Sequence, residues 1–289
     1  MIRLLVPLLL IGTSMLGACA PNSQNTVLNI REEQARSQQI VRQMDAKQAL
    51  IKDADLNSYV NGLVARLAKH RPPGSVPLKV FLVKDADVNA FTTGGGYLFV
   101  NAGMLAAMEN EAQLATVLAH EIGHIDRGHI QAQQSNRQLV GVLGAVAQIG
   151  AGLAGVDGSL TNLGIGLGKA YATNAYSRRQ ETDADLTGFQ MAAAAGYNMV
   201  EGAGSFDVLR RLYGDKNGVE AAFFSSHPAA SDRAAQLKAK ARAEGYDKGR
   251  VGTRSYARAT RKLRREALEF YQLNGRVREA DQIRRNLRN

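Results

Sequence analysis

The chain has one cysteine, Cys19, in 289 residues, and fewer acidic residues than basic ones. A single cysteine excludes an intramolecular disulfide, so this is not a small disulfide-stapled scaffold. Hydrophobic residues make up 45% of the chain, which is enough for a full core in one or two domains. No internal repeat of about 20 to 50 residues is present, so the sequence does not support a repeat architecture.

The first eighteen residues have the pattern of a secretory signal. Arg3 precedes a short apolar run, and small residues lead up to Cys19. The run is too short for an ordinary membrane span. The junction LGAC (residues 16–19) resembles a bacterial lipobox, in which cleavage leaves the cysteine as the first residue and its thiol carries a lipid. We therefore expect a lipoprotein signal peptide over residues 1–18 and lipidation at Cys19, with an uncleaved N-terminal anchor as the alternative.

Helices are predicted in the segment that follows. Residues 19–30 are polar and are expected to form a tether, and a charged helix is expected from about Arg31. Apolar residues recur at helical spacing over residues 56–67. Asp53 and Asp55 precede them, and acidic residues are typical of the start of a helix. One face of this second helix should therefore lie in the core.

A small sheet is predicted next. Residues 71–77, RPPGSVP, end the helix, and residues 78–83, LKVFLV, are typical of a strand. Residues 88–101 contain two short strands joined through Gly94, Gly95 and Gly96, which indicates an antiparallel hairpin. Helical patterns dominate from there to the C-terminus. The expected class is α+β, mainly helical, with a small antiparallel sheet.

One apolar segment permits two interpretations. Residues 139–156 carry no charge over eighteen positions, but five of them are glycine. This segment is either a membrane span or, as we favour, a mobile or buried apolar stretch. The glycine-rich residues 141–168 are compatible with a movable cover or with simple disorder.

The positive charge is concentrated at the C-terminus. The chain has a net charge of +10, and residues 251–289 hold eleven Lys/Arg against four Asp/Glu, a net +7. An exported protein rarely meets nucleic acid, so we exclude nucleic acid as a partner. We expect a basic helical extension with a solvated face, or one that contacts anionic lipid or a protein partner.

Three of the five histidines lie within residues 120–129, HEIGHIDRGH. On a helix each residue advances about 100°, so His120 and His124 lie about 40° apart and can hold one ion. His129 would lie about 140° farther round and point away if the helix continued. Some zinc peptidases use H-E-x-x-H-x-x-G-x-x-H, but Gly128 and His129 are out of register with it. We therefore predict that His129 caps or packs rather than ligates.

A third ligand is needed, because a catalytic zinc has three protein ligands and an open position. Glu181 and Asp185 are four residues apart in a helical pattern, so their carboxylates share a face. Glu181 can ligate the ion, and Asp185 can accept the free ring N–H of a ligating histidine. The alternative is an ordinary solvated helix with acids beside Arg178 and Arg179.

Glu121 lies between the two histidines and can face the water without ligating the metal. There it can act as general base on water whose pKa the ion has lowered toward about 7, and then pass the proton to the leaving amine. H-E-x-x-H on a strong helical pattern is fairly specific for this chemistry.

Three separated motifs together carry a family resemblance: NEAQLATVLAHEIGHIDRGH, YSRRQETDAD and HPAASDR. In this order, over about residues 50 to 240, they resemble the HtpX-like and BepA-like zinc metallopeptidases, relatives of the prenyl-protein (CAAX) endopeptidases. The resemblance implies a zincin-type peptidase domain, taken here as residues 31–250, with one Zn²⁺ per chain.

The resemblance also implies roles for single residues. It implies zinc ligands at His120, His124 and Glu181, with Glu121 as base and Asp185 as the residue positioning a ligand. It places His227 near the metal, either steadying the oxyanion or filling the open position in a resting state, and Arg233 beside the site. In relatives a stretch like residues 94–105 forms an edge strand that pairs with an extended peptide. The residues expected to bind substrate are Gly95, Gly96, Tyr97 and Leu98, within the same family-like segment as Asn89 and Ala90.

The resulting hypothesis is a lipid-anchored zinc endopeptidase of the bacterial envelope that acts on misfolded or stalled membrane or exported proteins. Ala20 after Cys19 favours the outer membrane, facing the periplasm, over the inner membrane. Envelope assembly proteins are further candidate partners. One rival is a non-proteolytic chaperone or assembly lipoprotein whose zinc site is closed by a fourth ligand, such as His227. The other is a thermolysin-type peptidase, which the 57-residue spacing from His124 to Glu181 disfavours.

Overall fold

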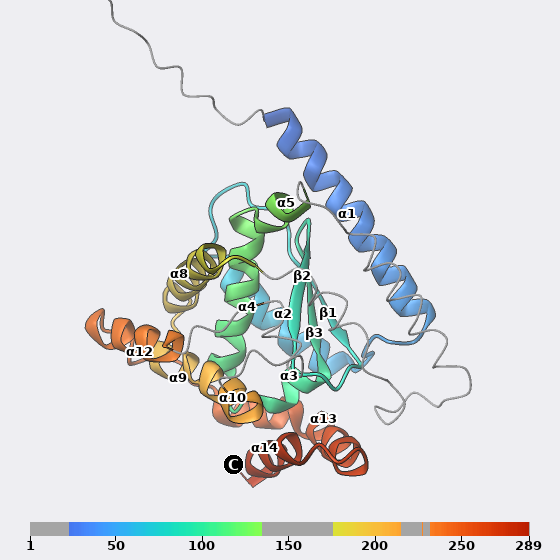
Figure 1. Cartoon of the computed structure of the whole chain (residues 1–289), viewed down its shortest axis with the longest axis vertical. Coiled ribbons are helices and arrows are strands. Elements are labelled where there is room, and N and C mark those ends of the chain that lie inside the picture. Colours follow the sequence, from blue (N-terminus) through green and yellow to red (C-terminus); the bar gives the residue numbers. More distant parts are fainter. Residues whose placement is uncertain (1–22, 135–175, 215–226, 228–231, 289) are drawn as a thin grey trace, which may run out of the picture.

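The computed structural model describes residues 23–134, 176–214, 227 and 232–288, in which helices surround a small sheet (Figure 1). The predicted signal peptide, Cys19, the apolar segment 139–156 and the glycine-rich segment 141–168 all lie outside these residues. Among the described helices, none has the length and apolarity needed to cross a membrane. The first elements are α1 (Ser23–Ala46), α2 (Ala54–Ala68), β1 (Lys79–Val83), β2 (Ala90–Gly94), β3 (Tyr97–Asn101), α3 (Ala102–Ala107), α4 (Glu111–Asp126) and α5 (His129–Gln134).

The remaining described elements are helical. Their bounds are α8 (Arg178–Ala194), α9 (Met199–Gly202), α10 (Gly204–Tyr213), α12 (Arg233–Ala243), α13 (Thr253–Leu273) and α14 (Val277–Arg288). This mainly helical chain with one small sheet confirms the α+β class. The predicted second helix is α2, where Asp53 caps the first turn by accepting the N–H of Leu56 and the apolar face is buried.

The sheet is mixed rather than wholly antiparallel. The expected hairpin is present, since β2 pairs antiparallel with β3, but β1 pairs parallel with the other side of β3. The strand order is therefore β1-β3-β2, with β3 in the centre and β2 at one edge. The connection over residues 84–89 leaves a gap of one strand between β1 and β2. Strand β3 then fills that gap, antiparallel to β2 and parallel to β1.

This strand order corrects the expected edge strand. Tyr97 and Leu98 lie in the central strand, where both sides are already paired, so neither can accept an added chain. Gly95 lies in the β2–β3 turn, where its N–H donates to Glu33 and its carbonyl accepts from Gln34 of α1. The sheet has two edges, β1 and β2, and the outer side of β1 already pairs with residues 49–51. The edge that lies beside α4 and could take an added strand is that of β2.

Helix α1 is longer than predicted and belongs to the folded body. It begins at Ser23, inside the expected tether of residues 19–30, because no glycine or proline interrupts the chain before Ala46. It lies along the sheet beside β2 (Figure 1). Ile40 and Met44 are buried there against a cluster that includes Phe91.

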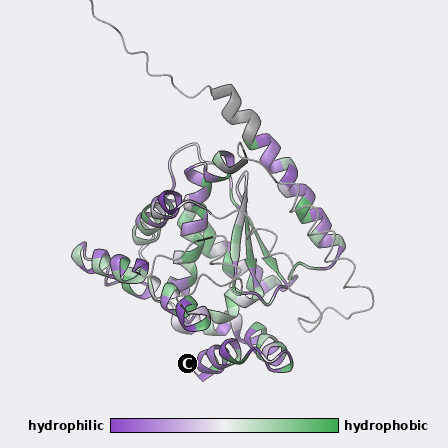
Figure 2. Ribbon diagram, in the orientation of Figure 1, coloured by the Kyte–Doolittle hydropathy of each residue, from purple (hydrophilic) through white to green (hydrophobic). Residues whose placement is uncertain are grey.

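Helices α13 and α14 pack on the same core. The Tyr256 hydroxyl donates to the carbonyl of Leu105, and the Tyr271 hydroxyl donates to the carbonyl of Ala86. Figure 2 shows the outer faces of both helices as largely hydrophilic. The predicted basic extension over residues 251–289 is thus helical, but its apolar side is continuous with the core of residues 31–250.

Two glycines allow α4 and α8 to lie very close together. A Cβ on Gly188 would lie 2.7 Å from the backbone nitrogen of His120, and one on Gly123 would lie 2.9 Å from the carbonyl oxygen of Ala184. Backbone atoms cannot yield to such contacts as flexible side chains can. This approach brings together the two helices that carry the predicted metal ligands.

Replacing Gly188 by alanine should therefore destabilise the protein. We expect the free energy of unfolding to fall by about 1 to 3 kcal/mol, the usual cost of overpacking, in a urea titration. Gly62→Ala is the matched control, since a Cβ there meets nothing within 4 Å and alanine favours a helix. Equal stability of the two variants would contradict the close approach of α4 and α8.

Candidate active site

Helix α4 presents the H-E-x-x-H motif in a fully buried setting. Asn110 caps its first turn by accepting the N–H of Gln113, and every residue from Glu111 to His124 is buried between α8 and β2. His120 and His124 are one turn apart, and their Nε2 atoms lie 3.0 Å from each other. The helical geometry predicted from the sequence is therefore present.

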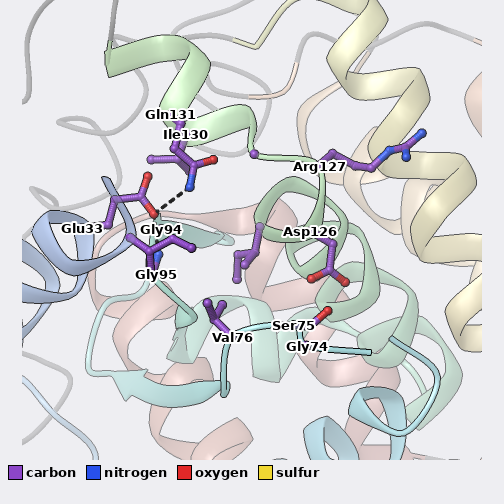
Figure 3. Close-up of a pocket in the computed structure, with 13 residues that line it drawn as sticks. Glu33, Gly74, Ser75, Val76, Gly94, Gly95, Asp126, Arg127, Ile130 and Gln131 are labelled. Atoms are coloured by element: carbon purple, nitrogen blue, oxygen red, sulfur yellow. Dashed lines mark hydrogen bonds between the residues drawn. The ribbon is translucent and has the colours of Figure 1, made fainter. Parts of the chain in front are cut away.

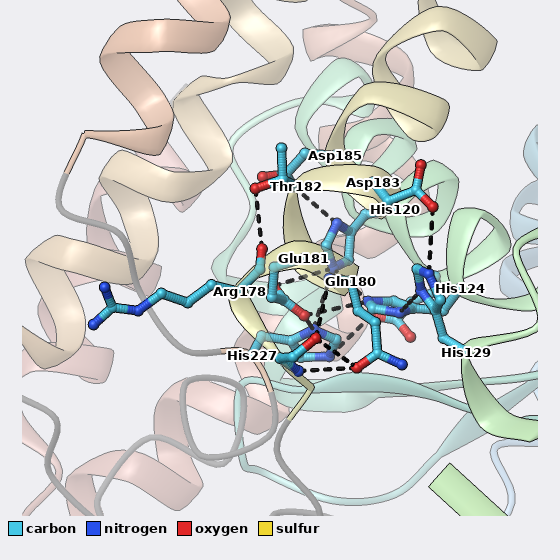
Figure 4. A network of polar contacts seen from close by, with 12 residues as sticks. His120, His124, His129, Arg178, Gln180, Glu181, Thr182, Asp183, Asp185 and His227 are labelled. Atoms are coloured by element: carbon cyan, nitrogen blue, oxygen red, sulfur yellow. Dashed lines mark hydrogen bonds and ion pairs between the residues drawn. The ribbon is translucent and has the colours of Figure 1, made fainter. Parts of the chain in front are cut away.

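Helix α8 brings Glu181 to these histidines (Figure 4). Ser177 and Gln180 form a capping box at its start, which sets Glu181 in the first turn. The Glu181 oxygens lie 3.4 Å from His124 Nε2 and 3.7 Å from His120 Nε2. The structure thus places the three predicted ligands side by side.

His227 joins them as a fourth donor. One ligand atom each from His120, His124, Glu181 and His227 lies within 4.8 Å of the others, and all four residues are buried. His227 Nδ1 is 2.9 Å from a Glu181 oxygen and 3.2 Å from His120 Nε2. It therefore occupies the side of the site that the three predicted ligands leave open.

The protonation of His124 and Glu181 suits a metal ion. Burial lowers the pKa of His124 well below its ordinary value, so the ring is neutral and can offer a lone pair. Burial disfavours the Glu181 carboxylate, but His227 and His120 more than offset burial and lower its pKa. At His227, by contrast, Glu181 and Glu121 outweigh burial and raise the pKa, so this ring favours a proton over a metal ion. A neutral His124 and an ionised Glu181 are the protonation states that a catalytic zinc site requires of its donors.

Asp185 and Arg233 hold the ligands in place. The Asp185 carboxylate lies 2.9 Å from His120 Nδ1, so it can accept that N–H and direct the Nε2 lone pair toward the other donors. Arg233 donates to both Asp185 oxygens, at 2.7 and 2.6 Å, and pairs with Glu181 at 2.8 Å. One guanidinium therefore fixes two carboxylates of the site.

Glu121 is buried beside the four donors and is not one of them. It is 1% exposed, and its oxygens have no hydrogen-bond partner within the described part of the chain. One of them faces His227 Nε2 at 3.3 Å. Burial raises the pKa of Glu121 above its ordinary value, which increases its affinity for a proton.

His129 is not among the four donors, as the motif register predicted, but it does not point away from the site as it would on a continuing helix. The helix does not continue, because Arg127 and Gly128, at φ +65°, end α4 and turn the chain back. His129 Nδ1 consequently lies 2.9 Å from His124 Nδ1, and its other nitrogen lies 3.5 Å from Asp183. His129 is outside the group of four donors, and it contacts the back of a ligand.

Loss of this contact should weaken metal binding. We expect His129→Phe, which keeps a ring but removes both nitrogens, to raise the metal Kd about 10- to 100-fold in a competition titration with a chromophoric chelator. His70→Phe is the control, because His70 is exposed on a different part of the chain. An unchanged Kd for His129→Phe would mean that this residue only packs.

Tyr176 was missed by the motif analysis. Its buried ring stacks on His124 with ring centroids 3.7 Å apart, and it also lies beside His227. Burial raises its pKa far above the ordinary value. The available signal was its position as the first residue of the motif YSRRQETDAD.

Two histidines one turn apart, a carboxylate from a second helix and a buried glutamate between the histidines define a metallopeptidase site of the H-E-x-x-H type. The sequence pattern of peptidase family M48 matches residues 50–241, and the chain belongs to this family. The resemblance seen in the three motifs is thereby confirmed.

Several curated relatives match parts of the chain. It is 32% identical over 186 residues to the beta-barrel assembly-enhancing protease of Escherichia coli O157:H7, covering 61% of this chain and 37% of that protein. It is 29% identical over 157 residues to metalloprotease LoiP of Escherichia coli (strain K12), covering 54% and 59%. It is 28% identical over 147 residues to mitochondrial metalloendopeptidase OMA1 of Arabidopsis thaliana, covering 51% and 28%.

Proposed function

We propose that this chain is a zinc-dependent endopeptidase with Glu121 as general base. The proposal depends chiefly on one observation: His120, His124 and Glu181 converge beside a buried Glu121 carboxylate that has no hydrogen-bond partner in the described residues. A purely structural metal site has no need of a buried carboxylate that accepts no hydrogen bond, which is costly to maintain. Membership of peptidase family M48 supports the same activity.

The roles of the residues follow from their positions. Zinc, when bound by His120, His124 and Glu181, would polarise the scissile carbonyl and lower the pKa of water toward about 7. Glu121 takes the proton from that water and delivers it to the leaving amine. His227, with Nε2 3.3 Å from Glu121, is placed to donate to the oxyanion. The products form without a covalent enzyme intermediate.

Polypeptide substrate would pair with β2. The Asn101 N–H donates to the Asn89 carbonyl, so Asn89 with Asn101 is a hydrogen-bonded pair of the ladder, and the register makes Phe91 with Phe99 the next such pair. Ala90 and Thr92 belong to the alternate pairs, and their main-chain N–H and C=O groups therefore point away from β3. Main-chain pairing reads little side-chain sequence, which favours unfolded chains as substrates. Because β2 and the site are buried, substrate access requires a rearrangement of the surrounding chain.

The proposed setting is the bacterial envelope. The signal pattern, the lipobox-like junction and Ala20 support a lipid anchor at Cys19 and the periplasmic face of the outer membrane. Several relatives carry the name beta-barrel assembly-enhancing protease, which supports envelope assembly proteins as partners. We therefore propose misfolded or stalled membrane and exported proteins as substrates.

A closed structural site is the second candidate. His227 lies among the metal donors and would complete a four-coordinate zinc site, as in non-catalytic zinc proteins. The same geometry fits a resting peptidase in which His227 occupies the position of water. The two candidates differ in one outcome, which is hydrolysis of an unfolded chain.

Metal removal tests the activity directly. Chelation should abolish cleavage of an unfolded reporter protein, and addition of about one equivalent of zinc should restore it, because the pKa of water returns to its ordinary value without the ion. Cleavage is measured as fragments on a gel and zinc by elemental analysis. A zinc-loaded chain that cleaves no unfolded protein would support the closed structural site.

A further inference from the structure

A cavity of about 320 Å³ lies beside the site and plays no part in the chemistry above (Figure 3). It is enclosed by α1, the β2–β3 turn, the loop before β1, the end of α4 and the start of α5. Ile30, Val76, Ile125 and Ile130 provide apolar walls, and Glu33 is among its polar residues. We call it the Glu33 pocket.

Glu33 has one carboxylate oxygen without a partner. Its Oε2 accepts the Gly95 N–H at 2.7 Å and the Gln131 amide at 3.3 Å. Its Oε1 makes no hydrogen bond in the described part of the protein, and it has no access to bulk water because the whole residue is only 1% exposed. A buried carboxylate oxygen in this state is unfavourable unless a donor or cation supplies the missing contact.

The other charges that line the pocket are already matched. Asp126 accepts three hydrogen bonds from Arg71, at 2.6 to 3.1 Å. Arg127 points to Asp183 and pairs with it. Burial raises the pKa of Glu33 to about 7, against the opposing effects of Gly95 and Arg36. Glu33 is thus the acid whose charge the lining residues leave uncompensated.

The pocket lies along the path expected for substrate. Strand β2 runs beside α4 (Figure 1). It ends at Gly94, which lines the pocket. The four residue steps from Ala90 to Gly94 span about 13 Å in an extended chain. The charge of Glu33 also acts on Tyr176, whose ring stacks on His124. A chain paired with β2 would therefore bring a side chain or its end to Glu33.

We propose that the Glu33 pocket binds a cationic group of the polypeptide substrate, supplied by a lysine or arginine side chain or by the chain's amino terminus. The apolar walls would contact an aliphatic stem, and the Glu33 carboxylate would accept from the ammonium or guanidinium group. The pocket would then select where an otherwise permissive enzyme cuts. This inference depends on the endopeptidase function proposed above.

Matched peptides test the pocket. A quenched fluorescent peptide of neutral sequence is compared with versions that carry one lysine, or norleucine as its uncharged counterpart, at successive positions around the cleaved bond. Each is made with a free and with an acetylated amino terminus, which separates a side-chain cation from a terminal one. We expect one lysine position, or the free terminus, to raise kcat/KM about tenfold over its uncharged counterpart, equivalent to about 1.4 kcal/mol.

The variants assign that preference. Glu33→Gln should reduce the lysine-to-norleucine ratio to about one, and Val76→Lys should do the same from the opposite wall by placing a competing ammonium in the pocket. Glu32→Gln, an exposed neighbour on α1, should keep the full ratio. A ratio that persists in Glu33→Gln and Val76→Lys, or no preference in the parent enzyme, would overturn the proposal.

Binding distinguishes failure of the pocket from failure of the enzyme. Fluorescence anisotropy of the same peptides on zinc-loaded Glu121→Gln protein reads the pocket without any cleavage. Tighter binding of the cationic peptide that disappears with Glu33→Gln in this background supports the pocket even if the parent chain hydrolyses nothing. Equal binding of cationic and uncharged peptides overturns the pocket, whether or not the parent chain is a peptidase.

Discussion

Glu121→Gln is expected to lower kcat/KM on an unfolded substrate by about 10²- to 10⁴-fold while zinc content stays unchanged. Glutamine keeps the shape of the side chain but cannot accept the proton. Because Glu121 is not one of the four converging donors, its loss should not release the metal. Cleavage rate and zinc content are measured on the same preparation.

The control for Glu121→Gln is Glu266→Gln, an exposed carboxylate on α13. This substitution removes the same charge without touching the site and should leave cleavage unchanged. Undiminished cleavage by Glu121→Gln would remove Glu121 from the mechanism. If the variant loses its zinc together with its activity, Glu121 would instead be a residue that holds the metal.

Glu181→Ala is expected to remove most of the bound zinc and, with it, the activity. Two histidines are too few donors for a tightly held catalytic zinc. The remaining charges make the loss worse, because Arg233 would keep its positive charge beside the site after losing one of its two carboxylate partners. Elemental analysis after dialysis against a weak chelator measures the effect.

His227→Ala is the matched comparison for Glu181→Ala, since both residues belong to the group of four donors. If Glu181 is a permanent ligand and His227 occupies a replaceable position, the His227 variant keeps its zinc while the Glu181 variant loses it. Full zinc occupancy in Glu181→Ala would place the third ligand elsewhere. Loss of zinc from both would favour the closed structural site.

Local patterns in the sequence predicted the parts of the site that depend on helical spacing. His120 with His124, and Glu181 with Asp185, are each four residues apart, so forming the helix is enough to put each pair on one face. The meeting of the two pairs needed more than spacing. Gly123 and Gly188 permit that approach, and the family resemblance, rather than any local rule, indicated it.

One failure arose where distant segments decide the geometry, and two arose from local features that were misjudged. The pairing of β1 with β3 does not depend on the alternation of apolar and polar residues within either strand. The sequence therefore could not show that β3 is the central strand. His129 was misplaced because a positive φ at Gly128 reverses the chain, and a continuing helix was the simpler assumption. Residues 23–30 appeared irregular because their polarity resembles that of a linker, yet nothing in them stops a helix.

The 24 residues of α1 have a mechanical consequence. A helix of this length is about 36 Å long, and its later turns are tied to the sheet by Ser37 and Glu33, whose partners are Thr93 and Gly95. If Cys19 carries a lipid, α1 acts as a stiff spacer between the bilayer and the peptidase. The turns that precede Glu33 would set the height at which chains are cut, and insertions or deletions of whole turns there would change that reach.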